Sequence, residues 1–229
     1  MSLQDNQDKA LTMWKNILSK GALQYNIMLT SLFVLFFETL KDFLIDRPLS
    51  LYCCDSCEMK DGKDVYKEND TYKREVRSLN KSKKLHASVQ WFQKQGALSE
   101  EEANLIYKAE KRRNVLVHEF LNFLSEGWNE DNLSLLVEII FLYQRLDSWW
   151  VFNYEFDEDE VPNPETVTQK DCYSLSAAVL QVVKDVILGN DKQYSGWMEQ
   201  IQEAVRQQRA TASATAASQS MDVRQESEK

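Results

Sequence analysis

The chain has 229 residues, of which 43% are hydrophobic and 28% charged, and its formal net charge at pH 7 is −9. This length suits one well-cored domain with appendages, and the hydrophobic content excludes a wholly disordered chain. The acidic balance argues against a protein that coats nucleic acid over its whole surface, although it allows a local basic site.

The beginning of the chain carries no recognisable targeting signal. Residues 1–15 are polar and lack an apolar core ahead of small residues, so we expect no secretory signal peptide. The longest apolar run, residues 27–37, has about half the ~20 residues that a membrane span needs. Four cysteines do not make a disulfide framework in a chain of this length. Together these features predict a cytoplasmic protein that makes no contact with a membrane.

The first half of the chain is expected to form two helices. Apolar or small residues recur every three or four positions from Leu11 to Phe43, which predicts a long N-terminal helix that ends before Pro48. Residues 48–70 show little periodicity and are expected to form a loop. A second helix is expected over residues 71–94, with a basic surface.

The second half begins with the clearest helix start in the sequence. Ser99 and Glu102 have the spacing of a capping box, which predicts a third helix running to about Ser125. A fourth helix is expected from Asn129 or Asp131 and a fifth over residues 171–188. The sequence therefore predicts an all-α bundle of about five helices at residues 1–188, a C-terminal helix at 189–208 and a disordered tail at 209–229.

Several kinds of chemical site are absent from the sequence. Six scattered glycines cannot build a phosphate-binding loop, and two histidines cannot supply an HExxH metalloprotease motif. Cys54 and Cys57 have the spacing of half a zinc knuckle, but no second paired motif completes four ligands. Partly buried thiols in a loop are the alternative for Cys53, Cys54 and Cys57. We expect neither a metal nor a cofactor.

A basic stretch offers a possible nucleic-acid contact. Residues 73–84 carry six basic side chains against one acidic residue, Glu75, and His86 follows. Such a run is either a solvated helix surface or a track for phosphate groups, and His86 is either a surface or an interface histidine. The RNA-binding candidates are Lys81, Lys83, Lys84, Lys111 and Arg112.

The most informative segment is residues 111–120, KRRNVLVHEF. On a helical wheel Asn114, His118 and Asn122 form a polar stripe nearly opposite an apolar arc of Leu105, Ala109, Leu116 and Phe120. Arg113 lies about 140° from His118 and nearer the apolar arc. The residues alone allow two alternatives. Arg113 and His118 form a functional pair, or His118 is a surface histidine and Arg113 is a structural arginine paired with a carboxylate such as Glu38.

Arg113-Asn114-x-x-x-His118 resembles the R-x4–6-H motif, often RNxxxH, of the HEPN superfamily (higher eukaryote and prokaryote nucleotide-binding domains). The resemblance covers residues 1–188 and includes an acidic residue, Glu38, on the long first helix. It implies a four- to five-helix bundle that forms a homodimer. In active members it also implies a metal-independent endoribonuclease, with Arg113, Asn114 and His118 as catalytic residues. Silent scaffolds occur in the family as well.

One position departs from the family pattern. HEPN toxins that a partner enzyme silences by adding AMP carry R-x4-H-x-Y, whereas this chain has Phe120 in place of the tyrosine. That form of control is therefore in doubt here. Another antitoxin or regulatory protein remains compatible with the resemblance, as does a role as a toxin or defence effector.

The residue types fit RNA cleavage. The 2′-hydroxyl of RNA is the nucleophile, histidine carries protons near neutral pH, and arginine stabilises the charged phosphate. One motif histidine per chain is one too few for a base and an acid, and a twofold dimer would supply the second. The alternatives are a catalytically silent HEPN-like module that binds a protein or nucleotide, and a structural helical subunit.

Overall fold

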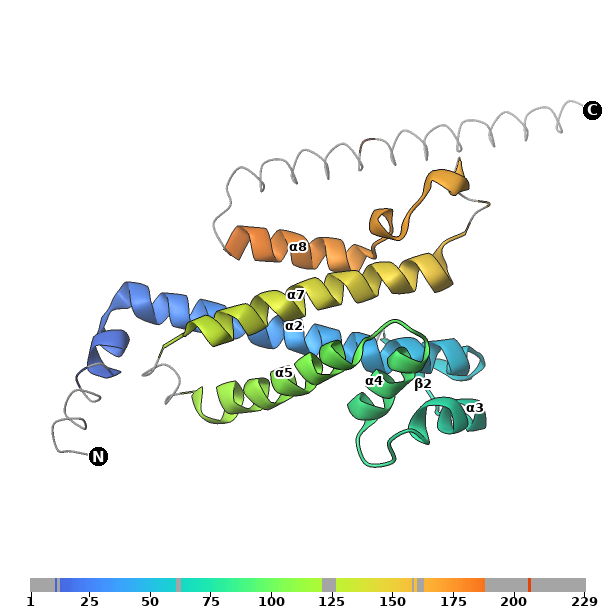
Figure 1. The fold of residues 1–229 in the computed structure, drawn as a ribbon, viewed down its shortest axis with the longest axis horizontal. Helices are drawn as coiled ribbons and strands as arrows, with labels where there is room; N and C mark the ends of the chain where they lie inside the picture. Colours follow the sequence, from blue (N-terminus) through green and yellow to red (C-terminus); the bar gives the residue numbers. More distant parts are fainter. Residues whose placement is uncertain are drawn as a thin grey trace, which may run out of the picture. The chain divides into compact units, whose positions relative to one another are not determined.

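The computed structural model describes residues 11, 13–60, 63–120, 127–157, 159, 163–187 and 206. These residues are mostly helical, which confirms the all-α fold class (Figure 1). The main helices are α2 (Lys20–Cys53), α4 (Lys84–Lys94), α5 (Glu100–His118), α7 (Glu130–Trp150) and α8 (Leu175–Ile187). Apart from Arg206, the expected C-terminal helix at 189–208 and the tail at 209–229 lie outside the described residues.

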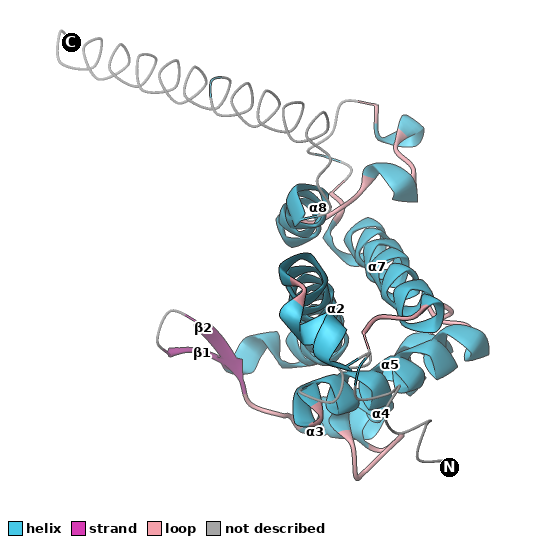
Figure 2. Cartoon of the chain, turned by 90° about the vertical axis from the view of Figure 1, so that its left-hand side faces the viewer, coloured by secondary structure: helices cyan, strands magenta, loops and turns pink. Residues whose placement is uncertain are grey.

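Helix α2 is the element around which α4, α5 and α7 pack. It contacts α4, α5 and α7, and α5 also contacts α7 (Figures 1 and 2). Its buried apolar residues recur every three or four positions, so they form one stripe: Leu29, Leu32, Phe33, Phe36, Phe37, Leu40 and Leu44. At the C-terminal half of α2, an aromatic cluster fills the space between α2, α4 and α7. The cluster consists of Phe43, Trp91, Phe92, Tyr143 and Trp150.

The prediction that the first helix ends before Pro48 is wrong, because α2 continues to Cys53. Proline removes one backbone hydrogen bond and costs about 3 kcal/mol inside a helix. Tertiary packing offsets that cost here. Pro48 itself is buried, and the Arg47 guanidinium lies 5.5 Å from the ring centre of Phe43 and 5.6 Å from that of Trp150.

The expected loop at 48–70 contains a small antiparallel hairpin as well as the end of α2. Strand β1 (Cys57–Lys60) pairs with β2 (Lys63–Tyr66), in the register Cys57 with Tyr66 (Figure 2). The two residues between these strands are Asp61 and Gly62 in the sequence, a pair that favours two-residue hairpin turns. That signal was overlooked in the sequence prediction.

The single helix expected over 71–94 is two helical segments. Helix α3 (Asp70–Tyr72) continues as a π-helical turn (Lys73–Arg77), and α4 begins only at Lys84. Asn80 makes the break, since its side-chain oxygen accepts hydrogen bonds from the backbone N–H groups of Ser82 and Lys83 at 3.1 and 3.0 Å. A short polar side chain that binds its neighbouring backbone competes with helix continuation.

The two predicted helix starts in the second half are confirmed. Ser99 and Glu102 exchange both capping-box hydrogen bonds, at 2.8 and 3.1 Å, and Asn129 caps α7 by accepting from Asn132 N–H. Helix α5 ends at His118, earlier than the predicted Ser125, while residues 121–126 are outside the described part of the chain. The motif histidine is therefore the last residue of its helix.

The chain divides into two compact units, Met1–Ala177 and Ala178–Lys229. All the elements named above except the remainder of α8 belong to the first unit. In the second unit, Gln181 donates hydrogen bonds to both carboxylate oxygens of Asp185 within α8. Among the described residues, no helix combines the length and the apolar character that crossing a membrane requires.

Candidate functional site

The buried arc of α5 decides where the motif side chains lie. Ile106, Ala109 and Leu116 are buried, whereas Leu105, expected in the arc, is half-buried. At 100° per residue, Arg113 falls inside this arc, between the directions of Ala109 and Ile106. Helix α5 therefore directs Arg113 towards α2 and leaves Asn114 and His118 exposed.

Arg113 forms an ion pair with Glu38 of α2, the carboxylate that the sequence analysis named as the partner of a structural arginine. Its Nε lies 2.5 Å from Glu38 Oε1, and each side chain is 28% exposed. Both atoms are buried without completing a hydrogen bond of good geometry, so the contact is electrostatic. The other end of the guanidinium is used differently, since Nη1 donates to Asn114 Oδ1 at 3.3 Å.

Glu38 is shared between two cations. Lys41, one turn further along α2, donates a hydrogen bond to Glu38 Oε2. Burial by itself would raise the pKa of the Glu38 carboxyl, but the hydrogen bond from Lys41 and the charges of Lys41 and Arg113 outweigh it. The net pKa lies below its ordinary value of 4.5, so Glu38 is a carboxylate at neutral pH.

Arg113 and Asn114 line a pocket of about 300 Å³ where α2, α4 and α5 meet. Four basic side chains and two carboxylates surround it, together with Asn114 and apolar residues. The lining residues are Phe37, Glu38, Lys41, Ile45, Lys83, Lys84, Leu85, Glu110, Arg113 and Asn114. The structure thus brings Lys83 and Lys84, predicted as RNA-binding residues, together with two of the three predicted catalytic residues.

The two pocket lysines at the start of α4 also pair with carboxylates. Lys83 Nζ lies 3.5 Å from Glu110 Oε1, and Lys84 Nζ lies 2.6 Å from Glu68 Oε1. The lysine side chains remain 55% and 52% exposed. Glu68 is shared in turn with Arg77, at 3.9 Å. A ligand that enters from solvent can therefore reach both ammonium groups.

His86 lies at the interface between α4 and α5. Its Nε2 is 3.0 Å from Glu110 Oε2, and its ring packs on Tyr107 with centroids 4.4 Å apart. Burial would raise the pKa of Glu110, but the hydrogen bond from His86 and the charge of Lys83 lower it overall. This supports the interface alternative for His86.

His118 lies apart from the pocket. Its side chain is exposed and makes no hydrogen bond or ion pair with the described part of the chain, and it is one helical turn beyond Asn114. Next to this end of α5 is an apolar hollow of about 530 Å³, lined by Thr30, Ser31, Val34, Leu35, Leu116, Val117 and Phe120. Within one chain, His118 therefore lies on the same helix as Arg113 but outside the pocket that Arg113 lines.

The remaining predicted RNA-binding residues do not converge on the pocket. Lys81 is exposed in the turn before α4, and Lys111 is exposed on α5. Arg112 is half-buried and engaged with other groups. Asn122 of the predicted polar stripe lies outside the described residues.

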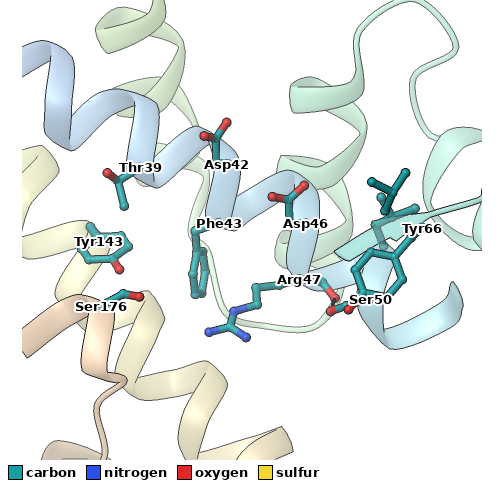
Figure 3. A pocket seen from close by; sticks show the side chains of 11 residues that line it. Thr39, Asp42, Phe43, Asp46, Arg47, Ser50, Tyr66, Tyr143 and Ser176 are labelled. Carbon is teal, nitrogen blue, oxygen red and sulfur yellow. Dashed lines mark hydrogen bonds between the residues drawn. The ribbon is translucent and has the colours of Figure 1, made fainter. Parts of the chain in front are cut away.

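A second pocket, of about 530 Å³, contains none of the motif residues. Figure 3 shows the Asp42 and Asp46 carboxylates on one side of α2 and Phe43 and Arg47 on the other. Arg47 is committed to structure, since its Nη1 lies 2.6 Å from Glu155 Oε1 and its guanidinium packs on aromatic rings. The lining residues include no histidine or cysteine, which leaves this pocket without a ready proton carrier near neutral pH.

The cysteines are all thiols rather than disulfides. Cys53 and Cys172 are buried, whereas Cys54 and Cys57 are exposed around the turn that leads into β1. Across the described ranges, no three or more His, Cys, Asp or Glu side chains gather as a metal site would require.

Two residues of the pocket were missed in the sequence analysis. Lys41 stands three residues after Glu38, and Glu110 stands three residues before Arg113, so each lies on the same helix face as a residue already named. That spacing was the available signal. The meeting of α4 with α2 and α5 had no local signal, because it depends on how the helices pack.

Comparisons with known proteins give no information on the function, which is therefore argued from this chain's own residues. No protein-family model matches the chain, and no similar curated protein or similar solved structure was found.

Proposed function

We propose that this chain is a metal-independent endoribonuclease of HEPN type, which cleaves RNA as a homodimer in the cytoplasm. One observation carries the proposal: Arg113 and Asn114 line a cationic pocket, and His118 stands one helical turn further along the same helix. Cleavage of a phosphodiester by its own 2′-hydroxyl needs proton transfer and stabilisation of the charged phosphate, and an imidazole and a fixed guanidinium are suited to these two tasks.

In the proposed reaction, His118 accepts the proton of the 2′-hydroxyl while the 2′-oxygen attacks phosphorus. The bond from phosphorus to the 5′-oxygen breaks, and that oxygen takes a proton from a second imidazolium. The products are a 2′,3′-cyclic phosphate and a 5′-hydroxyl. No oxidant, metal or further co-reactant enters the balance.

Arg113 is suited to hold the phosphate because Glu38 fixes its Nε side and leaves Nη1 directed towards Asn114. A guanidinium remains protonated throughout the reaction and presents several donors in a fixed plane. Asn114 adds an amide that can orient the phosphate or the imidazole. The ion pair with Glu38 is therefore compatible with a structural role of Arg113 and with a functional one.

The second imidazole comes from the partner chain in this proposal. His86, the other histidine, is hydrogen-bonded to Glu110, which lies eight residues before His118 on α5. That separation is about 12 Å along the helix axis. A twofold axis beside the exposed C-terminal end of α5 would bring two His118 side chains together.

The experiment is to incubate the purified protein with single-stranded RNA in EDTA and to identify the new ends. We expect cleavage with 2′,3′-cyclic phosphate termini, loss of activity in His118→Ala, and a wild-type melting temperature for that variant because His118 is exposed. Intact RNA with the wild type, or an active His118→Ala, would contradict the proposal.

A second candidate is a catalytically silent module of the same fold. It is favoured by the position of His118 outside the pocket and by the commitment of Arg113 to Glu38. On this alternative the pocket binds its ligand and His118→Ala changes nothing, so the same experiment distinguishes the two.

A further inference from the structure

We infer that the pocket between α2, α4 and α5 is a phosphate-binding site, and that it holds a phosphodiester of the RNA strand next to the bond that is cleaved. This inference rests on the proposed function for the identity of the ligand. The site itself is argued from Lys41, Lys83, Lys84 and Arg113, which three separate helices bring to one cavity of about 300 Å³.

The first argument is the charge of the pocket. Each carboxylate that lines the pocket is shared by two basic side chains, Glu38 by Lys41 and Arg113 and Glu110 by Lys83 and His86. Glu68, outside the lining, is likewise shared by Lys84 and Arg77. Four cations therefore line the pocket against two carboxylates. Asp46 also acts electrostatically on Lys84, and the cations remain in excess when it is included.

This excess stands out against the whole chain, whose formal net charge is −9. A cationic cavity on an acidic protein attracts an anion locally and repels it elsewhere. The four lining cations also differ in kind. Arg113 offers a planar fork suited to phosphate oxygens, and the lysines are flexible point charges that adapt to a ligand.

The second argument is that the cations are available. The Lys83 and Lys84 side chains are more than half exposed, so their ion pairs with carboxylates are weak and a phosphate can displace them. In addition, α4 begins at this pocket without a side-chain cap, so its first N–H groups add donors to those of the lysines.

The third argument concerns the source of the phosphate. The pocket and His118 lie along one helix, α5, with Asn114 between Glu110 and His118. A strand whose scissile phosphate is held by Arg113 beside His118 would place a neighbouring phosphate at Lys83 and Lys84 if it follows the helix. A free nucleotide has no neighbouring phosphodiester that could lie at His118 while its own phosphate is in the pocket.

The test uses the full-length wild type and a short 2′-O-methyl oligonucleotide, which lacks the attacking hydroxyl and cannot be cleaved by the proposed reaction. Its affinity is measured by fluorescence polarisation over a range of salt concentrations. The double variant Lys83→Gln/Lys84→Gln removes two pocket charges. Lys94→Gln is the matched control, because Lys94 is exposed at the opposite end of α4.

We expect the double variant to bind about tenfold more weakly at low salt and to lose at least about 0.7 from the slope of log K against log salt, the contribution of one phosphate contact on a single strand. Lys94→Gln should match the wild type. Equal affinity and equal slope for the double variant and the control would overturn the inference.

A second arm distinguishes the sources of phosphate. The same oligonucleotide is compared with and without a 5′-terminal phosphate, and inorganic phosphate is added as a competitor. A strand site predicts that the terminal phosphate makes little difference and that millimolar inorganic phosphate competes weakly. Binding that requires the terminal phosphate would overturn the assignment to a strand phosphodiester.

Failure of this inference differs from failure of the proposed function. The binding measurement needs no cleavage, so the pocket can be supported in a protein that leaves RNA intact. Conversely, cleavage that depends on His118 but is unaffected by the lysine variants would support the ribonuclease and overturn the pocket.

Discussion

Arg113 has two roles, and substitution by lysine separates them. Arg113→Lys keeps a positive charge opposite Glu38 but loses the planar fork, so we expect stability near that of the wild type and loss of most RNA cleavage. Arg113→Ala leaves Glu38 with Lys41 alone and should cost about 1–3 kcal/mol, between the values for exposed and buried ion pairs. Urea unfolding and cleavage assays of both variants check this. Full activity in a well-folded Arg113→Ala would remove Arg113 from the mechanism.

Glu38 and Glu110 predict how stability depends on pH. Both carboxyls have a pKa below the ordinary value of 4.5, where partner cations outweigh burial. A carboxyl with a lowered pKa stabilises the fold above about pH 4.5, and this contribution is lost as the pH falls through the pKa of the folded state. We therefore expect the melting temperature to fall below pH 4.5. Glu38→Gln should show a shallower fall than the wild type, and an unchanged profile would contradict the lowered pKa.

Among the elements, the turn before α4 carries the sharpest prediction. Asn80→Ala removes the acceptor of the Ser82 and Lys83 N–H groups, which should cost about 1 kcal/mol. Because this turn sets the direction of Lys83 and Lys84, RNA binding should weaken as well. Asn104→Ala is the control, since Asn104 is exposed within α5 and alanine is the better helix former. If both variants unfold at the same urea concentration, the Asn80 contacts contribute nothing.

The helices also show which of their starts, ends and breaks could be predicted from the sequence. Helix starts at Ser99 and Asn129 were predictable because a cap is formed by residues three positions apart. The continuation of α2 through Pro48 was not, because packing of Arg47 on Trp150, far away in the sequence, outweighs a local rule. The break at Asn80 was missed because the helix expected over 71–94 took no account of a side chain that binds the backbone two and three residues further on.

The candidate site divides in the same way. The motif from Arg113 to His118 and the pairing of Arg113 with Glu38 could be anticipated from one helical wheel and the residue types. The pocket could not, since Lys83 and Lys84 share a cavity with Arg113 through the packing of α4 against α2 and α5. Residue types thus suggested the chemistry, and helix packing determined which residues share a cavity.

For the whole molecule, the prediction concerns mixed dimers. If two chains share one active site, a heterodimer of wild type and His118→Ala, isolated through two different tags, should have far less than half the wild-type activity. This follows from the need for one imidazole to accept a proton and another to donate one. A heterodimer with half the activity would mean that each chain works alone, and a fully active monomer would exclude the shared site.

The uncapped start of α4 has a consequence for local motion. The N-cap residue Lys83 provides no side-chain hydrogen bond, so the first-turn amides of α4 depend on water or a ligand for their acceptors. In the free protein these amides should exchange with deuterium quickly, while those of α5, closed by its capping box, exchange slowly. Bound RNA should slow exchange at residues 84–86 more than in the middle of α7. Exchange at these amides that RNA leaves unchanged would mean that no ligand group reaches this end of α4.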